Sequence, residues 1–194
     1  MLEVCAKSSS GVWFGVACEE PRVFAAAFAD TQQELIHSLL CSLPFNVPFE
    51  VTSAGSAFAQ KTLLLIENVY RGKDVTLKQV CFATEHLPFY TRKVLQTVSL
   101  IPGGYVASYG AVAKVAGGGA RAVGNVMAAN PFAPVVPCHR VVSADFTLGG
   151  YSGGLNVKLE LLKRERRGHV KKREVPIGGK MLTVFPVEFV LKDF

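Results

Sequence analysis

A cysteine followed by a histidine and an arginine is the most reactive combination of side chains in this sequence. These residues are Cys138, His139 and Arg140, and they come directly after Pro137. Imidazole and guanidinium groups beside a cysteine favour the thiolate, which is the nucleophilic form. Cys138 is therefore the candidate nucleophile. A small buried cysteine next to a core histidine is the alternative interpretation of such a pair on its own.

The sequence around this cysteine resembles the O6-alkylguanine-DNA alkyltransferases, a family of DNA repair methyltransferases. The family's hallmark Pro-Cys-His-Arg-Val stands here as residues 137–141, and five further blocks match in the same order and spacing. The resemblance covers residues 89–165. The other blocks are Thr91-Arg92-Lys93-Val94-Leu95, Val106-Ala107-Ser108-Tyr109, Ala120-Arg121-Ala122-Val123-Gly124, Asn130-Pro131 and Tyr151-Ser152-Gly153-Gly154-Leu155.

The resemblance implies a catalytic role for five residues. Cys138 resembles the family's alkyl acceptor, and His139 resembles the base that acts on the thiol through a water molecule. Glu165 resembles the carboxylate that orients that histidine. Without the resemblance, Glu165 would be interpreted as a solvated residue at the end of a basic helix. Tyr109 hydrogen-bonds the guanine ring and helps to neutralise it as a leaving group. Asn130 is the hinge between a helix and the active-site segment.

The resemblance also implies a set of DNA-binding and substrate-binding residues. Arg121 resembles the arginine that fills the vacated base stack, whereas an isolated arginine is usually a surface charge. In the resembled family this helix enters the minor groove, and the small residues around Arg121 would allow such a close approach. The set is Arg121, Tyr109, Thr91, Ala120, Gly124, Val141, Tyr151 and Ser152.

These roles imply a repair protein that acts once on double-stranded DNA containing O6-alkylguanine. The target base must leave the stack before a side chain reaches its O6 atom. We expect irreversible alkyl transfer to Cys138, no cofactor, no ATP and a monomer. A damage-recognition protein of the alkyltransferase-like type is the non-enzymatic alternative, but those proteins lack the acceptor cysteine. A thiol hydrolase is the third interpretation, and it gives Tyr109, Arg121 and Asn130 no role.

The residues before the active-site blocks predict an N-terminal α/β lobe. Asp30 is a plausible N-cap, with Gln33 at the capping-box position. The expected elements are strands over 2–6, 12–18 and 22–28, a helix over about 30–43, a loop marked by Pro44, Pro48 and Gly55, and a helix over 56–70.

The second half predicts a mainly helical lobe. Helices are expected over 91–100, from the N-cap Ser108, and over 120–129, and the last two are joined by Gly117-Gly118-Gly119. Two short helices around a glycine turn are typical of a helix-turn-helix. The fold class is α/β (α+β): an N-terminal lobe with a small sheet and helix, then a mainly helical lobe with the helix-turn-helix and the active-site loop. The expected domains are 1–86, 87–165 and 166–194.

Charge is distributed unevenly along the chain. Residues 1–90 hold 6 Lys or Arg and 9 Asp or Glu, a net of −3, whereas residues 91–194 hold 15 and 6, a net of +9. A basic second half suits a polyanionic partner. The apolar runs are too short to cross a bilayer. We expect no membrane contact and a cytoplasmic, nucleoid-associated protein if the source is prokaryotic, or a nuclear one if it is eukaryotic.

The five cysteines do not suggest a secreted disulfide framework. Some members of the resembled family bind zinc in the N-terminal lobe, where Cys5 and Cys18 stand here. We predict no metal, because His37 and His86 lack ligand-like spacing. A disulfide between Cys5 and Cys18 is the alternative that the spacing leaves open.

Two features depart from the resembled family. Ala133 stands where some members have a second proline against the alkyl group, which leaves the tolerated alkyl size open. Residues 166–194 extend beyond the common core. The basic run 166–173 fits a DNA-phosphate contact, a targeting address or a solvated helix end, and 184–191 is apolar enough for an added strand.

Overall fold

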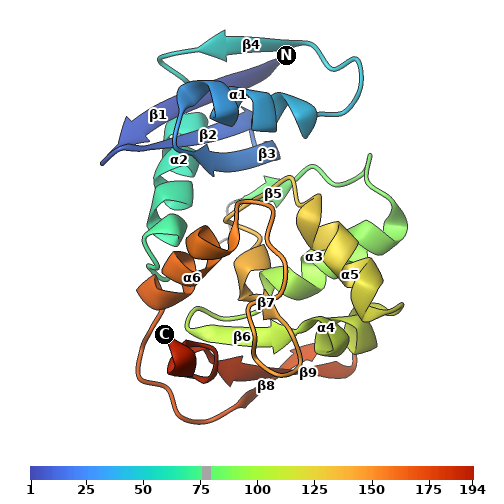
Figure 1. The fold of residues 1–194 in the computed structure, drawn as a ribbon. Coiled ribbons are helices and arrows are strands. Elements are labelled where there is room, and N and C mark those ends of the chain that lie inside the picture. The colour runs from blue at the N-terminus through green and yellow to red at the C-terminus, as the bar shows by residue number, and fades with distance from the viewer. Residues whose placement is uncertain (76–79) are drawn as a thin grey trace. The chain divides into compact units, whose positions relative to one another are not determined.

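The computed structural model describes residues 1–75 and 80–194 and divides the chain into two compact units (Figure 1). No helix in these two ranges has the length and apolar character needed to cross a membrane. Unit 1 contains Met1–Tyr70, Asp74–Leu87 and Pro131–Val135, and unit 2 contains Arg71–Lys73, Pro88–Asn130 and Val136–Phe194.

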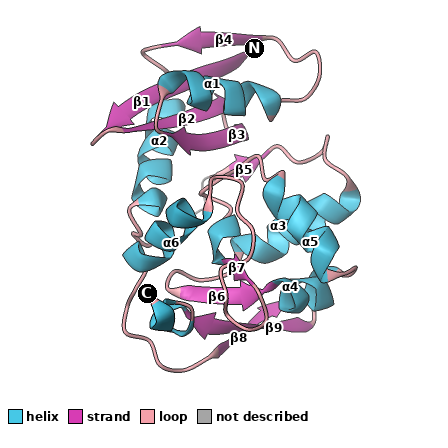
Figure 2. Cartoon of the chain, in the orientation of Figure 1, coloured by secondary structure: helices cyan, strands magenta, loops and turns pink. Residues whose placement is uncertain are grey.

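Unit 1 is built on a five-stranded sheet in the order β4-β1-β2-β3-β5 (Figure 2). Its three central strands form an antiparallel meander, and the two short edge strands pair in parallel. The strands are β1 (Leu2–Ser9), β2 (Val12–Glu19), β3 (Arg22–Ala29), β4 (Phe49–Thr52) and β5 (Cys81–Phe82).

Two helices, α1 (Gln32–Cys41) and α2 (Ala57–Tyr70), cover the sheet of unit 1. Leu39 of α1 lies so close to Gly15 of β2 that a Cβ atom there would be 2.6 Å from Cδ1 of the leucine. The adjacent Phe14 makes an edge contact with Tyr70 of α2, with ring centroids 5.2 Å apart. Successive strand residues point to opposite faces of the sheet, and here each face is covered by a helix. Both sets of residues are therefore buried, which explains why β2 is apolar almost throughout.

Two expectations for unit 1 were wrong. The N-cap of α1 is Thr31, not Asp30: its hydroxyl accepts the N–H of Glu34 at 3.2 Å and donates to that carboxylate at 2.8 Å. Both residues are capping types, and only Thr31 has a glutamate three positions later. The loop expected after α1 contains β4, whose residues are mostly exposed and so lack the alternation that marks a strand.

Unit 2 contains four helices and a second sheet, in the order β7-β6-β9-β8. Ser108 caps α4 as predicted, because its hydroxyl accepts the N–H of Ala111 at 3.1 Å. The elements are α3 (Phe89–Ser99), β6 (Tyr105–Ser108), α4 (Tyr109–Ala116), α5 (Ala120–Ala128), β7 (Val141–Val142), α6 (Leu155–Arg164), β8 (Arg173–Ile177) and β9 (Lys180–Pro186).

The sheet of unit 2 was not predicted, since the second lobe was expected to be mainly helical. Strand β6 pairs in parallel with β7 and antiparallel with β9, so it joins the segment after Cys138 to the C-terminal extension. Its four residues are largely buried and too few to show a period of two.

The C-terminal extension also differs from expectation. Helix α6 ends at Arg164, so residues 166–172 of the basic run form a loop and not a helix end, and Arg173 begins β8. The strand expected over 184–191 stops at Pro186, which has no amide to donate, and short 3₁₀ helices follow at Val187–Phe189 and Leu191–Asp193. Buried residues Val184 and Val187 make the extension part of the core.

Candidate active site

Cys138 begins a single 3₁₀ turn, Cys138–Arg140, between Pro137 and strand β7. The N–H of Cys138 donates to the carbonyl of Val136 at 2.8 Å, and the N–H of Arg140 donates to that of Pro137 at 2.9 Å. Cys138 is 4% exposed and His139 is fully buried. The tight turn therefore holds both side chains inside unit 2.

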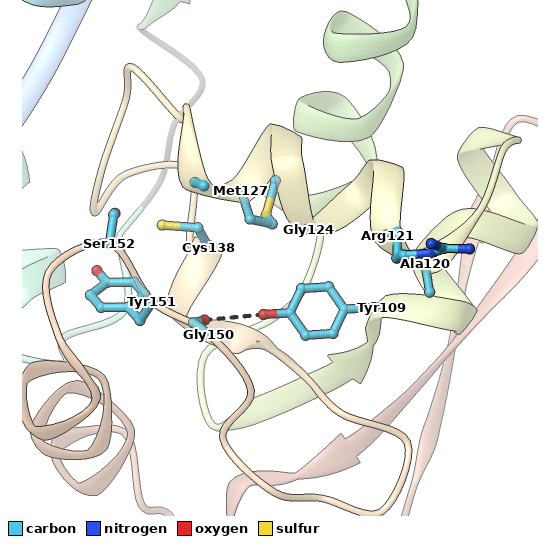
Figure 3. A pocket seen from close by; sticks show the side chains of 10 residues that line it. Tyr109, Ala120, Arg121, Gly124, Met127, Cys138, Gly150, Tyr151 and Ser152 are labelled. Carbon is cyan, nitrogen blue, oxygen red and sulfur yellow. Dashed lines mark hydrogen bonds between the residues drawn. The ribbon is translucent and has the colours of Figure 1, made fainter.

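The thiol of Cys138 belongs to a pocket of about 600 Å³ in unit 2 (Figure 3). The helices α4 and α5, the Cys138 turn and the loop before α6 supply its walls. Its lining is mostly apolar, with few polar groups, as in many small-molecule sites. The lining residues are Tyr109, Ala120, Arg121, Gly124, Met127, Ala128, Cys138, Gly150, Tyr151 and Ser152.

A buried carboxylate ties the segment around Cys138 to the end of α6. Glu165 accepts from Nε2 of His139 at 2.9 Å, from Nε of Arg140 at 2.9 Å and from Nη2 of Arg140 at 2.7 Å. It also accepts the N–H of Gly104 at 3.3 Å. Burial opposes ionisation, but His139 and Arg140 outweigh it and hold the pKa of Glu165 at about 2. The carboxylate is therefore charged at neutral pH.

His139 is held as a neutral imidazole with one defined tautomer. Burial lowers its pKa despite the opposing effect of Glu165. Because the carboxylate accepts at Nε2, that nitrogen carries the proton and Nδ1 has a free lone pair. Nδ1 is buried and makes no hydrogen bond with any described group. It is placed to accept a proton.

Burial raises the pKa of the Cys138 thiol, and three neighbours oppose this effect. Asn130 and Tyr151 hydrogen-bond the cysteine, and the charge of Lys158 attracts the thiolate. The amide of Asn130 also donates to the carbonyl of Val136 at 2.8 Å. Asn130 therefore connects the end of α5 to the segment that carries Cys138.

Tyr109, the first residue of α4, lies across the pocket from Tyr151 (Figure 3). Its hydroxyl donates to the carbonyl of Gly150 at 3.1 Å. Gly149 has φ of +65°, and a Cβ there would lie 2.9 Å from the Tyr109 ring. Only glycine combines that backbone with so close an approach. Burial raises the pKa of Tyr109, which keeps its hydroxyl protonated.

Lys158 of α6 is a site residue that the sequence analysis missed. It is fully buried, and its ammonium donates to the carbonyls of Val141, Leu148 and Gly150. A lysine among the polar residues of an amphipathic helix is normally expected to be exposed, so the helical pattern does not predict that Lys158 is buried. The match to Tyr151-Ser152-Gly153-Gly154-Leu155, which ends three residues earlier, was the available signal.

The first turn of α5 carries Arg121 at the rim of the pocket. Arg121 and Ala120 are exposed, and Figure 3 shows the guanidinium pointing away from Cys138. Two other predicted DNA-binding residues do not line the pocket. Thr91 lies in the first turn of α3, and Val141 is buried in β7 with its carbonyl bonded to Lys158 at 2.7 Å.

Unit 1 offers no metal cluster among the described residues, where no three His, Cys, Asp or Glu side chains gather. All five cysteines are free thiols, so the alternative disulfide between Cys5 and Cys18 is not formed. Both thiols donate instead to the carboxylate of Glu3, at 3.8 and 3.6 Å.

Comparison with known proteins shows one consistent family. The model of the 6-O-methylguanine DNA methyltransferase DNA-binding domain matches residues 89–167. A methylated-DNA–protein-cysteine methyltransferase of Methanothermobacter thermautotrophicus is 46% identical over 76 residues, which are 39% of this chain and 43% of that protein. The chain thus spans less than half of that curated relative.

Solved structures extend the similarity to most of the chain. The O6-methylguanine-DNA methyltransferase of Pyrococcus kodakaraensis is 32% identical with a TM-score of 0.66, over 85% of this chain and 99% of that one. Mycobacterium tuberculosis OGT, solved in complex with DNA, shares the fold with a TM-score of 0.65 and 24% identity, over 84% of this chain and 92% of that one.

Proposed function

Because the chain belongs to the O6-methylguanine-DNA methyltransferase family, we propose that it is a DNA repair protein that transfers an alkyl group from O6 of guanine to Cys138. One observation carries the proposal. Cys138 lines a pocket of about 600 Å³ and stands directly before a buried histidine whose tautomer is fixed by Glu165. That is the arrangement required to activate a nucleophile inside a substrate-sized space.

In the proposed reaction, the sulfur of Cys138 attacks the alkyl carbon on O6. An S–C bond forms while the C–O6 bond breaks, and the bonding pair stays with the guanine. The thiol proton passes through a water molecule to Nδ1 of His139, and the hydroxyl of Tyr109 donates a proton to the guanine ring. Tyr109 then regains a proton from water while His139 releases one to water, so both side chains return to their neutral forms. The products are guanine and a thioether. Because a thioether is not hydrolysed, each protein molecule reacts once.

We propose double-stranded DNA as the partner, with the target nucleotide flipped into the pocket. A base in the stack keeps its O6 atom out of reach of any side chain. The small residues of α5, such as the exposed Ala120 and the half-buried Gly124, suit a close approach to the minor groove, and Arg121 would fill the vacated stack. Tyr151, Ser152 and the backbone at Val141 would recognise the guanine, Thr91 would contact the DNA backbone, and Asn130 would serve as the hinge.

The proposal assigns DNA binding and alkyl transfer to residues 87–165. It gives residues 1–86 and 166–194 supporting roles, and it requires one protein molecule and no diffusible cofactor. The net charge of +9 over residues 91–194 supports a polyanionic partner.

Intact-mass measurement after mixing with O6-methylguanine duplex tests the proposal. We expect one methyl group per protein molecule, on the peptide that contains Cys138. The Cys138→Ala variant should bind the same duplex and gain no mass. Binding without methylation of the unaltered protein would instead assign the chain to damage recognition. Repeated turnover, or a methyl group on Cys5, Cys18, Cys41 or Cys81, would refute the proposed acceptor.

A further inference from the structure

Lys158 is a fully buried cation whose partners include the pocket residue Gly150, and the proposed reaction leaves it without a role. Its side chain is fully inaccessible, and Nζ lies 2.7 Å from the carbonyl oxygen of Val141, 2.5 Å from that of Leu148 and 3.3 Å from that of Gly150. An ammonium group has three protons to donate. Lys158 thus has an acceptor for each of them.

These acceptors come from two segments, each of which also contributes a lining residue to the pocket. Val141 follows the turn of Cys138, whereas Leu148 and Gly150 belong to the loop that leads to α6. The carbonyl of Gly150 accepts from both Lys158 and the hydroxyl of Tyr109. Lys158 therefore fixes the group against which Tyr109 is held.

The ammonium also lies near the faces of two pocket aromatics. Nζ is 5.8 Å from the ring centroid of Tyr109 and 5.9 Å from that of Tyr151, both within the range of cation–π attraction. A single cation thus contacts α4, the pocket loop and β7 at once.

The charge of Lys158 is not neutralised by its hydrogen-bond partners, because all three are neutral carbonyls. The buried carboxylate of the site, Glu165, is paired with the half-buried Arg140 at 2.7 Å. Burial lowers the pKa of Lys158 to about 8, and a negative charge on Cys138 opposes that effect. The same attraction lowers the pKa of Cys138. Tyr151 links the two groups, since it hydrogen-bonds Cys138 and its ring centroid lies 5.9 Å from Nζ of Lys158. A buried cation with no counter-ion is costly, so a thiolate in the same pocket is favoured.

We propose that Lys158 is the positioning residue of this site: it fixes the Gly150 carbonyl that holds Tyr109, and it is the counter-charge of the Cys138 thiolate. The proposal deepens the function proposed above, since it names the source of the nucleophile's charge. The titratable groups that interact with the pair are Tyr109 from α4, Tyr151 from the pocket loop and His139 from the Cys138 turn.

Thiol reactivity without DNA tests this role. The full-length protein and the variants Lys158→Met, Lys158→Arg and Lys163→Met react with iodoacetamide between about pH 6 and 10, and the Cys138 peptide is quantified by mass spectrometry. Lys163 is the matched control, because it is an exposed residue of the same helix and pairs with Glu160. Thermal melting followed by circular dichroism checks that each variant is folded.

We expect Lys158→Met to shift the pH profile of Cys138 upward by at least one unit, which is about a tenfold loss of rate near pH 7. At high pH the rate should recover to near that of the unaltered protein. The Lys158→Arg variant keeps a positive charge, so the inflection of its pH profile should stay at the pH found for the unaltered protein. The Lys163→Met variant should leave the pH profile of Cys138 unchanged. An unshifted profile with a uniform loss of rate would show that Lys158 only supports the loop, and would overturn the counter-charge role.

A second measurement uses the unaltered chain, so it does not depend on the folding of any variant. The Lys158 side chain is titrated by NMR with ¹³C at Cε, before and after iodoacetamide has converted Cys138 to a neutral thioether. Coupling between two sites is reciprocal. Lys158 should therefore lose its proton at a lower pH once the sulfur is alkylated, and an unchanged midpoint would refute the pairing.

The DNA reaction separates this inference from the proposed function. The same variants are mixed with O6-methylguanine duplex, and the methylation rate is measured. If the unaltered protein fails to accept a methyl group, the proposed function fails, while the iodoacetamide profiles still decide the role of Lys158.

Discussion

Glu165 shows how one buried residue couples the stability of unit 2 to its chemistry. Its carboxylate is 1% exposed and binds an imidazole, a guanidinium and a backbone amide. An isolated charge at such a place would be strongly unfavourable, so the partners determine whether it can exist there. The same carboxylate fixes the tautomer of His139, which leaves Nδ1 free to accept a proton. Removing it should affect both folding and thiol activation.

Glu165 should make the protein less stable in acid. Its pKa of about 2 in the folded chain lies below the ordinary 4.5, so the stabilisation is complete above pH 4.5 and is lost as the pH falls toward 2. The span corresponds to about 3 kcal/mol in the free energy of unfolding. Glu165→Gln should lower stability at pH 7 by a similar amount, since Arg140 loses its counter-charge. Urea unfolding at several pH values measures both effects.

Glu160→Gln is the matched control for that experiment. Glu160 lies on α6 as well, but it is exposed and forms an ion pair with Lys163 at 3.2 Å. Exposed pairs contribute little, so this variant should stay within about 0.5 kcal/mol of the unaltered protein. If the free energy of unfolding of Glu165→Gln still falls between pH 4.5 and pH 2 as much as that of the unaltered protein, the acid sensitivity has another source.

At the scale of elements, α4 and α5 supply one wall of the pocket and divide the proposed work between them. Ser108 caps α4 and so fixes where Tyr109, its first residue, begins. Helix α5 buries Val123, Val126 and Met127 in unit 2 and leaves its small residues exposed or half-buried. Arg121 stands on the exposed side. Tyr109 therefore belongs to the proposed chemistry, and Arg121 to the proposed extrusion of the base.

Arg121→Ala and Tyr109→Phe should separate extrusion from chemistry. Intercalation of Arg121 offsets the few kcal/mol that unstacking of the target base costs. Arg121→Ala should thus slow methyl transfer from duplex DNA by at least tenfold more than transfer from the free O6-methylguanine base. Tyr109→Phe removes a proton donor and keeps the ring, so both substrates should slow by comparable factors. Single-turnover rates give the comparison.

Equal losses for Arg121→Ala on the two substrates would mean that Arg121 supports the pocket itself. Its role in the vacated stack would then have to be withdrawn. Lys114→Ala is a suitable control, because Lys114 is an exposed cation on α4 that does not line the pocket.

The sequence predicted the elements that have a long run of regularly spaced apolar residues or a strong local signal, such as a helix cap or a glycine turn. The central strands of unit 1, the cap at Ser108 and α5 with its preceding glycines all have such signals. The short strands β4 and β6 do not, because four residues cannot distinguish a strand from a loop, and only pairing with β1 and β9 makes them strands.

The same contrast holds for the site. The Cys138 turn is local in sequence and could be identified, whereas the contacts of Lys158 depend on the path of a loop that no periodicity describes.

At the scale of the whole molecule, the C-terminal extension is part of the fold of unit 2. Strand β9 pairs with β6, and Leu182, Val184, Val187 and Val190 are buried. Deleting residues 166–194 would expose this core, so truncation cannot test whether the basic run contacts DNA. The loop itself is anchored, because one oxygen of Glu188 accepts the N–H groups of Arg167, Gly168 and His169. Substitutions that remove charge alone are needed.

Lys171 and Lys172 are exposed on this anchored loop, within the half of the chain that carries a net charge of +9. A fixed loop that presents adjacent cations suits binding to DNA phosphates, and each phosphate that is neutralised releases counterions.

The double variant Lys171→Gln, Lys172→Gln should therefore weaken binding to any duplex and make it less dependent on salt. The slope of log affinity against log salt should become shallower by about 0.9 for each phosphate that the variant no longer neutralises. Fluorescence anisotropy over a range of salt concentrations measures that slope. Lys7→Gln, Lys61→Gln removes the same net charge from unit 1 and should leave the slope unchanged. Equal slopes for the two double variants would assign the basic loop to solvation, with its anchoring by Glu188 serving the fold alone.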